Sequence, residues 1–156
     1  MKFFVAIFAF LMLEGCVGHE TDNWVRMDDA ISLNGSSDNH VLFVEKRFKF
    51  IRPVIKFYMM GDCNERPTNQ PMPGVPVIVQ GKKLDMTIEC IQFGTPMHPG
   101  AILYPTTDEG RRIILGLITN NENLSITMPS GLVVNFENKG GRKAVRELQA
   151  LNDNPI

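Results

Sequence analysis

The chain has 156 residues, of which 44% are hydrophobic and 21% are charged, and its formal net charge is −1. This composition is typical of a globular protein and excludes a largely disordered one. The small net charge disfavours a dedicated nucleic-acid-binding protein, which would normally be more basic.

The chain begins with a short apolar segment, MKFFVAIFAFLMLEGC, in which one Lys precedes an uninterrupted run from Phe3 to Leu13. The run is well short of the roughly 20 residues that a helix needs to cross a bilayer. It is typical of the hydrophobic part of a secretory signal. We therefore predict that residues 1–15 are a signal peptide that is removed on export.

The apolar run ends in Leu13, Glu14, Gly15 and Cys16. This ending resembles the lipobox of bacterial lipoproteins, in which a small residue precedes a Cys that is acylated and becomes the new N-terminus. Glu14 departs from that pattern, which favours a small or apolar residue there. The resemblance covers the leader alone and implies lipidation at Cys16 and a place in the cell envelope, facing the periplasm or the cell surface. The alternatives are a secreted protein with Cys16 as a plain thiol, or an internal apolar helix.

Removal of the first 15 residues would leave 141, enough for one domain with a buried core. Residues 16–39 are polar and rich in Asn, Asp, Ser and Gly, which favours a lipid-anchored flexible tether. Within it, Trp24, Met27 and Ile31 have helical spacing behind the candidate N-cap Asp22, so a short amphipathic helix is expected there. Residues 40–156 are assigned to a β-rich domain.

From Val41 onward the hydrophobic pattern has a period of two, which is typical of half-buried strands. Turn-forming residues separate the apolar runs. The close spacing of the last three runs favours an antiparallel meander, because parallel connections need a dozen or more residues. Strands are predicted at 41–50, 54–60, 75–79, 84–93, 101–105, 111–119, 124–128 and 132–136, followed by a helix from about Gly141 to Leu151.

These elements predict a mainly β fold, an antiparallel β-sandwich or small barrel with one C-terminal helix. The strand ending in Phe136, the Gly140-Gly141 break and the following helix resemble the C-terminal part of small periplasmic β-sandwich proteins. That resemblance names no function.

The chain has three cysteines, Cys16, Cys63 and Cys90. If Cys16 carries lipid, an even pair remains, and an export signal implies an oxidising compartment. We therefore predict a disulfide between Cys63 and Cys90, which would stabilise the fold by roughly 3–4 kcal/mol. Two free thiols are the alternative.

The sequence carries no recognisable catalytic pattern. No G-x-S-x-G motif occurs, no Gly-rich phosphate loop follows a strand, and the carboxylate pairs fall in turns or loops. His19, His40 and His98 are isolated in loops, which is typical of solvated side chains rather than of metal ligands. We predict no catalytic residues, no metal site and no cofactor.

One segment, EKRFKFIRPVIKFY, interleaves cations with aromatic residues. Strand alternation alone, with rings inside and cations solvated, explains most of this pattern. The second interpretation is a surface for an anionic partner, formed if cations of neighbouring segments join the same face. The candidate partner-binding residues are Arg47, Lys49, Arg52 and Lys56, the neighbours are Lys82, Lys83, Arg111 and Arg112, and Phe48 and Phe50 are expected to be buried.

Together these features favour a non-catalytic cell-envelope lipoprotein that acts by binding, as an accessory subunit, an inhibitor or an exclusion factor. Its expected partners are the membrane, through the N-terminal lipid anchor, and another envelope protein or an anionic envelope component, but not nucleic acid. The alternatives are an exported small hydrolase and a plain secreted binding protein.

Overall fold

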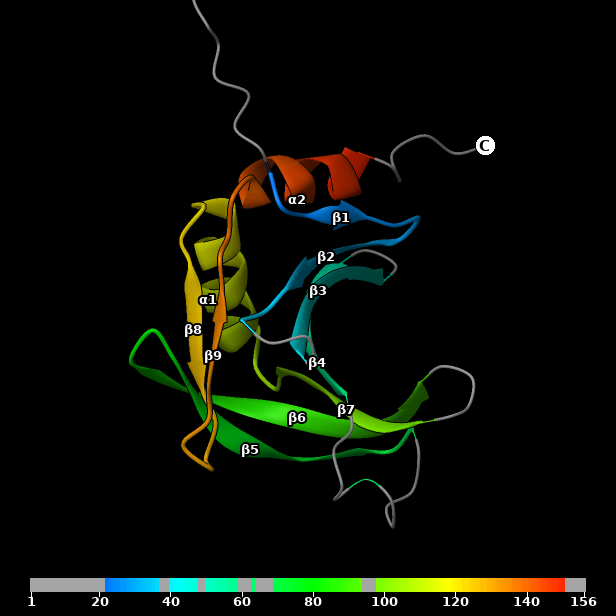
Figure 1. Ribbon diagram of the computed structural model, residues 1–156, viewed down its shortest axis with the longest axis vertical. Coiled ribbons are helices and arrows are strands. Elements are labelled where there is room, and N and C mark those ends of the chain that lie inside the picture. The colour runs from blue at the N-terminus through cyan, green and yellow to red at the C-terminus, as the bar shows by residue number, and fades with distance from the viewer. Residues whose placement is uncertain are drawn as a thin grey trace, which may run out of the picture.

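The computed structural model describes residues 22–36, 40–47, 50–58, 63, 69–93 and 98–150, and the predicted signal peptide and Cys16 lie outside these ranges. The described chain forms nine strands and two helices (Figure 1). In chain order they are β1 (Val25–Arg26), β2 (Ala30–Asn34), β3 (His40–Arg47), β4 (Phe50–Tyr58), β5 (Pro71–Val79), β6 (Lys82–Phe93), β7 (His98–Pro105), α1 (Asp108–Thr119), β8 (Leu124–Thr127), β9 (Val133–Phe136) and α2 (Gly141–Ala150).

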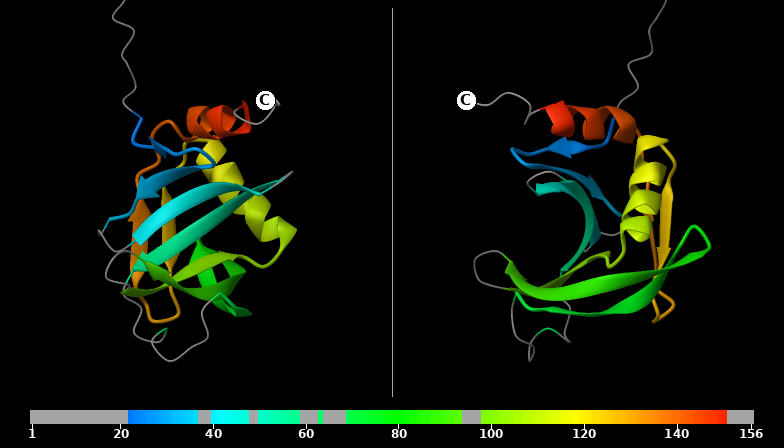
Figure 2. Two further views of the ribbon diagram at one scale, coloured as in Figure 1. Left: turned by 90° about the vertical axis from the view of Figure 1, so that its right-hand side faces the viewer. Right: turned by 180° about the vertical axis from the view of Figure 1, so that it is seen from behind.

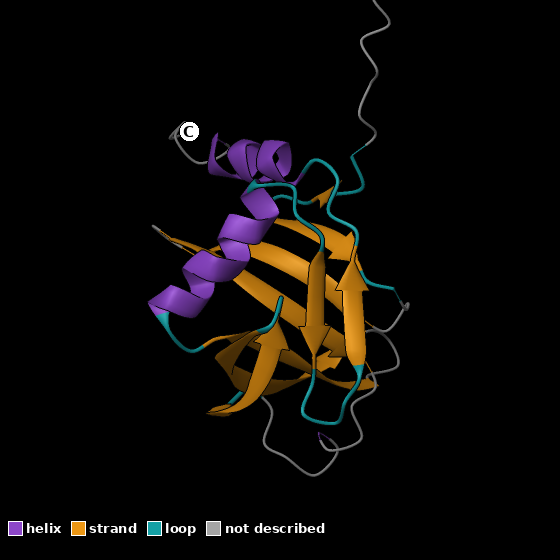
Figure 3. Ribbon diagram, turned by 90° about the vertical axis from the view of Figure 1, so that its left-hand side faces the viewer, coloured by secondary structure: helices purple, strands orange, loops and turns teal. Residues whose placement is uncertain are grey.

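The strands form one sheet in the order β1-β2-β3-β4-β7-β6-β5-β8-β9, and every neighbouring pair is antiparallel. The sheet curls into a half-barrel, with α1 lying beside the β8 and β9 pair (Figure 3). Helix α2 lies across the end of the molecule next to β1 and β2 (Figure 1). The predicted mainly β, antiparallel fold with a C-terminal helix is confirmed.

Both faces of the sheet bury apolar side chains. The main core lies between the sheet and the helices, where Ile114 and Ile118 of α1 and Leu148 of α2 are fully buried. A smaller cluster lies on the opposite face of the sheet and contains Ala30, Val41, Phe43, Val54 and Ile102. Since side chains alternate along a strand, β3 is apolar on both sides over residues 41–44.

Helix α1 replaces the strand that the sequence predicts at 111–119, so that prediction is wrong. The helix begins behind Thr107, whose side chain accepts a hydrogen bond from the Gly110 N–H at 3.0 Å. Asp108 and Glu109 occupy the first turn, where acidic residues favour a helix. Ile114 and Ile118 of the apolar run that suggests a strand are buried one helical turn apart, and the rest of the run is partly buried against the core.

Residues 22–36 belong to the sheet, although the sequence assigns them to a flexible tether with a short helix. That helix is absent here, because residues 25–26 and 30–34 form β1 and β2. Trp24 is buried, and its indole N–H donates to the Asn138 side-chain oxygen at 2.9 Å. This contact joins residues 114 positions apart, so tertiary packing overrides the local helical spacing.

The predicted disulfide joins Cys63 to Cys90, with the two Cα atoms 5.5 Å apart. Both residues are buried and belong to the main core. The backbone N–H of Asn69 also donates to the Cys90 carbonyl at 2.8 Å. The bridge therefore ties Cys63 to the middle of the sheet through β6, as the cysteine count predicts.

Candidate binding site

Two of the four predicted partner-binding cations, Arg52 and Lys56, project from β4 onto the face of the sheet turned away from α1. Cross-strand partners share a face of a sheet. Lys56 is paired in register with Val41 and Ile102, which belong to the smaller apolar cluster, and Arg52 is paired with Glu45. Figure 2, left, looks onto this side of β3 and β4. We call it the cation–aromatic face, formed by Ala30, Val41, Phe43, Glu45, Arg52, Val54, Lys56, Ile102 and Tyr104.

The other predicted residues of this segment cannot be placed. Lys49 and Phe48 lie outside the described residues. Arg47 ends β3 and Phe50 begins β4, but their side chains are not among the described ones. The expected outward direction of Arg47 and Lys49, and the expected burial of the two rings, remain predictions.

Lys56 lies directly above an aromatic ring. Its Nζ atom is 3.8 Å from the centroid of the Phe43 ring, which is within the range of a cation–π contact. Burial lowers the pKa of Lys56 below its ordinary value, while the carboxylates of Glu45 and Asp29 act in the opposite direction. Lys56 is therefore a cation that has lost part of its hydration and lies over an apolar floor.

Arg52 is held by two partners on the same face. Its guanidinium forms an ion pair with Glu45 at 3.0 Å and stacks 4.3 Å from the centroid of the Tyr104 ring. Its Nε atom is buried and has no hydrogen-bond partner in the part of the chain that the structure describes. A guanidinium held in this way is fixed in orientation.

The face therefore carries two partly buried cations over an apolar floor. Three carboxylates are near: Glu45 is paired with Arg52, Glu89 lies opposite Ile102 in register, and Asp29 is close enough to act on Lys56. Such a surface can bind an anionic group attached to an apolar body, because the cations have already lost part of their hydration. Among the described residues, no group of three or more His, Cys, Asp or Glu side chains could hold a metal ion.

Two of the neighbouring cations, Lys82 and Arg112, do not extend this face. Lys82 and Arg112 instead line a cleft of about 220 Å³ between the start of β6 and α1. Arg111 forms an ion pair with Asp108 of the same helix. Since Ile114 and Ile118 of α1 pack into the main core on the opposite face of the sheet, Arg112 is separated from Arg52 and Lys56.

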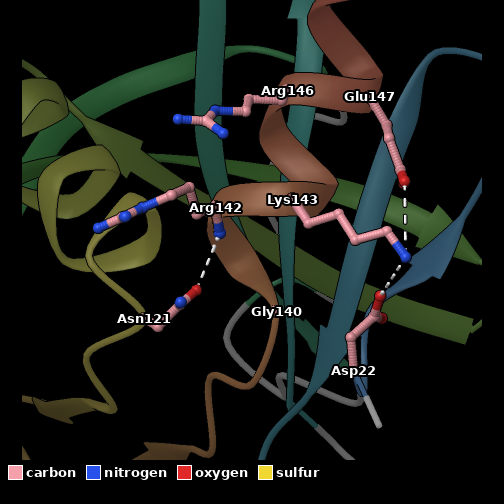
Figure 4. Close-up of a pocket in the computed structure, with 7 residues that line it drawn as sticks. All are labelled: Asp22, Asn121, Gly140, Arg142, Lys143, Arg146 and Glu147. Atoms are coloured by element: carbon pink, nitrogen blue, oxygen red, sulfur yellow. Dashed lines mark hydrogen bonds and ion pairs between the residues drawn. The ribbon is translucent and has the colours of Figure 1, made fainter. Parts of the chain in front are cut away.

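A second charged site, which the sequence analysis missed, lies at α2. A cleft of about 330 Å³ is lined there mainly by charged side chains, and Figure 4 shows them (Asp22, Asn121, Gly140, Arg142, Lys143, Arg146 and Glu147). The signal was readable, because Arg142, Lys143 and Arg146 fall on the side of the helix opposite the apolar stripe of Ala144 and Leu148.

Neither helix in the described ranges is long and apolar enough to span a bilayer. Comparison of the chain with models of protein families, with curated proteins and with solved structures finds no match. The proposals below are therefore argued from the residues and their geometry.

Proposed function

We propose that this protein is a non-catalytic binding protein of the cell envelope, anchored by lipid at Cys16. It holds an anionic group of another envelope protein, or of another envelope component, on the cation–aromatic face. The observation that carries the proposal is the placement of Lys56 and Arg52 above the rings of Phe43 and Tyr104.

Partial burial of these cations disfavours folding but favours the binding of an anionic ligand. Burial removes water from Lys56 and lowers its pKa, so its charge is less favourable in the fold than in the unfolded chain. Glu45 forms an ion pair with Arg52 but is not within ion-pair distance of Lys56. The buried Arg52 Nε atom has no hydrogen-bond partner among the described residues. A bound carboxylate or phosphate would give Lys56 an ionic partner.

The envelope location is supported by two features of the sequence and one of the fold. The leader has the length of a secretory signal, and its ending resembles a lipobox. The Cys63 and Cys90 bridge suits an oxidising compartment. Lipidation, location and partner are all open to direct measurement.

The test compares capture of envelope partners by tagged full chains carrying single substitutions. Lys56→Met removes the charge and keeps the apolar stem over Phe43, whereas Lys82→Met removes a cation away from this face. Loss of one charge-assisted contact corresponds to about 1.5–3 kcal/mol, so Lys56→Met should weaken salt-sensitive capture by about tenfold or more. Lys82→Met should leave it unchanged.

The mass of the mature N-terminal peptide is measured by mass spectrometry on the same samples. An acylated Cys16 is the expected result, and an unmodified Cys16 would contradict the anchor. Thermal unfolding of Lys56→Met checks that the fold is retained. Equal capture by folded Lys56→Met and wild type at low salt would place the binding site elsewhere on the molecule.

A further inference from the structure

The start of the described chain lies against α2. The Asp22 carboxylate is 4.0 Å from the Lys143 ammonium, and Arg26 bonds both to Asp22 and, at 2.8 Å, to Glu147. Five residues separate Asp22 from Cys16. Six residue steps span at most roughly 22 Å when fully extended. A lipid on Cys16 would therefore keep the α2 end of the molecule within about that distance of the bilayer.

The outward side of α2 is basic. Its exposed residues are Arg142, Lys143, Arg146, Gln149 and Ala150, so three of the five are cations. We call Arg142, Lys143 and Arg146 the α2 basic face. The only carboxylate in the helix, Glu147, is already engaged by Arg26, with Lys143 at 3.9 Å.

The charges of α2 are unfavourable for the helix itself. Arg142 and Lys143 lie in the first turn, where the helix dipole disfavours cations, and that turn has no acidic residue. Arg142 and Arg146 are four residues apart and extend to the same side of the helix (Figure 4), where like charges repel. Arg142 is fixed by a 2.8 Å bond from its Nε to the Thr119 carbonyl. Arg146 has no hydrogen-bond or ion-pair partner within the described ranges.

We propose that the α2 basic face rests on an anionic membrane surface, with the phosphate groups of acidic phospholipids bound at Arg142, Lys143 and Arg146. This inference rests on the proposed lipid anchor at Cys16. A bound phosphate offsets both the repulsion between the two guanidiniums and the mismatch with the helix dipole. Each Lys or Arg near an anionic membrane surface also adds electrostatic attraction.

With α2 on the membrane, the orientation of the rest of the molecule relative to the bilayer is also set. Helix α2 and β1 lie at one end, and the turn between β8 and β9 lies at the other end (Figure 1). The cation–aromatic face is on the side of the molecule between these ends (Figure 2). It therefore stays accessible to a partner while α2 is on the membrane.

The test uses the acylated full chain with a fluorophore at one introduced cysteine, either Gln149→Cys on α2 or Leu132→Cys at the far end. The chains are bound to vesicles of phosphatidylcholine, with or without phosphatidylglycerol, that carry a quencher in the headgroup layer. We expect quenching at position 149, dependent on phosphatidylglycerol and lost at high salt, and none at position 132. The triple variant Arg142→Gln, Lys143→Gln, Arg146→Gln should lose it. The control Lys82→Gln, Lys83→Gln, Arg112→Gln, with the same change in charge, should retain it.

The possible results separate this inference from the anchor. If Cys16 is acylated but positions 149 and 132 are quenched equally, or the folded triple variant behaves like wild type, the membrane-facing role of α2 is overturned and the anchor stands. Photocrosslinking from position 149 to a protein in the native envelope, without phosphatidylglycerol-dependent quenching, would also overturn it. An unmodified Cys16 overturns the anchor and this orientation with it.

Discussion

Helices α1 and α2 pack against the same core but place their charges in opposite ways. Helix α1 has its own N-cap, Thr107, and two acidic residues in its first turn. Helix α2 begins with Gly141, and the N–H of Arg142 is bonded by the Asn121 side chain from the end of α1. Its first-turn charges are cations. Residues of α1 itself thus stabilise the start of that helix. Helix α2 instead depends on packing and on hydrogen-bond partners from other segments, and its exposed cations are available for a ligand.

The largest expected effect comes from the packing that the two helices share. Ile118 of α1 and Leu148 of α2 are both fully buried. Ile118→Ala and Leu148→Ala should each lower the free energy of unfolding by about 2–5 kcal/mol, because each leaves a cavity in the main core. Urea unfolding monitored by circular dichroism measures both. A cost for Leu148→Ala near that of a surface substitution would mean that α2 is not an integral part of the domain.

Asn138 links the C-terminal end of α1 to Trp24, just before β1. Its side-chain oxygen accepts from the Trp24 indole, and its amide donates to the carbonyls of Ile118 and Glu122 at 3.0 Å each. Asn138→Ala leaves several buried groups without partners and should cost on the order of 3 kcal/mol. Asn135→Ala, at an exposed position of β9, is the matched control. Since Trp24 is the single tryptophan, its fluorescence should change in Asn138→Ala and not in the control.

Local patterns predicted helix α2 and most strands of the sheet well, and residues 22–36 and helix α1 poorly. The alternation in residues 75–93 is a direct consequence of half-buried strands, and β5 and β6 contain it. The predicted strand at 41–50 instead covers most of β3 and the start of β4, and β4 continues through residues 51–53, which the prediction left outside a strand. Residues 22–36 were misassigned because Trp24 is buried through Asn138, a partner that no local window contains. Helix α1 was misassigned because its apolar run outweighed Thr107 and the acidic first turn, although both signals were readable.

The candidate site was predictable in part. In the structure, Arg52 and Lys56 alternate along β4 with the buried Ile55 of the main core and lie on the opposite face. Alternation could not show that Phe43 and Tyr104 lie beneath these cations, because those contacts depend on the registers of β3 with β4 and of β4 with β7. It also suggested that the cations would be fully solvated, whereas Arg52 is largely buried by its neighbours.

The N-cap of α1 gives a smaller and local effect. Thr107→Ala removes the acceptor for the Gly110 N–H and should lower the free energy of unfolding by about 1 kcal/mol. Thr107→Ser keeps an acceptor and should restore most of the loss. If both variants were as stable as wild type, the helix would owe its start to packing alone, and the contrast with α2 would lose its basis.

Asp22 supplies the carboxylate that the first turn of α2 lacks. Hydrogen bonds from Arg26 lower the pKa of Asp22 below its ordinary 3.8, against a smaller opposing effect of burial. Because the folded pKa is lower than the unfolded one, ionised Asp22 stabilises the fold above pH 3.8, and the contribution is lost as the pH falls through the lowered value. Asp22→Asn should be roughly 0.5 kcal/mol less stable than wild type at pH 7 and low salt. The two should converge in acid, and a constant difference from neutral to acid pH would exclude the ionic contribution.

The smallest expected effect comes from an Arg→Gln substitution made separately in each helix, which tests whether the two helices place their charges in opposite ways. Arg146→Gln removes the repulsion from Arg142 one turn earlier and should raise the free energy of unfolding by about 0.2–0.5 kcal/mol. Arg112→Gln in α1 removes a cation four residues after Asp108, a favourable spacing, and should lower it by a similar amount. Both side chains are exposed, so packing should contribute little to either difference. Urea unfolding at low and high salt measures the two changes, which should have opposite signs and shrink together as salt screens them. If both substitutions changed the free energy of unfolding in the same direction, the charges of α2 would be no less favourable than those of α1. The cations of α2 would then not need a bound anion to offset their repulsion.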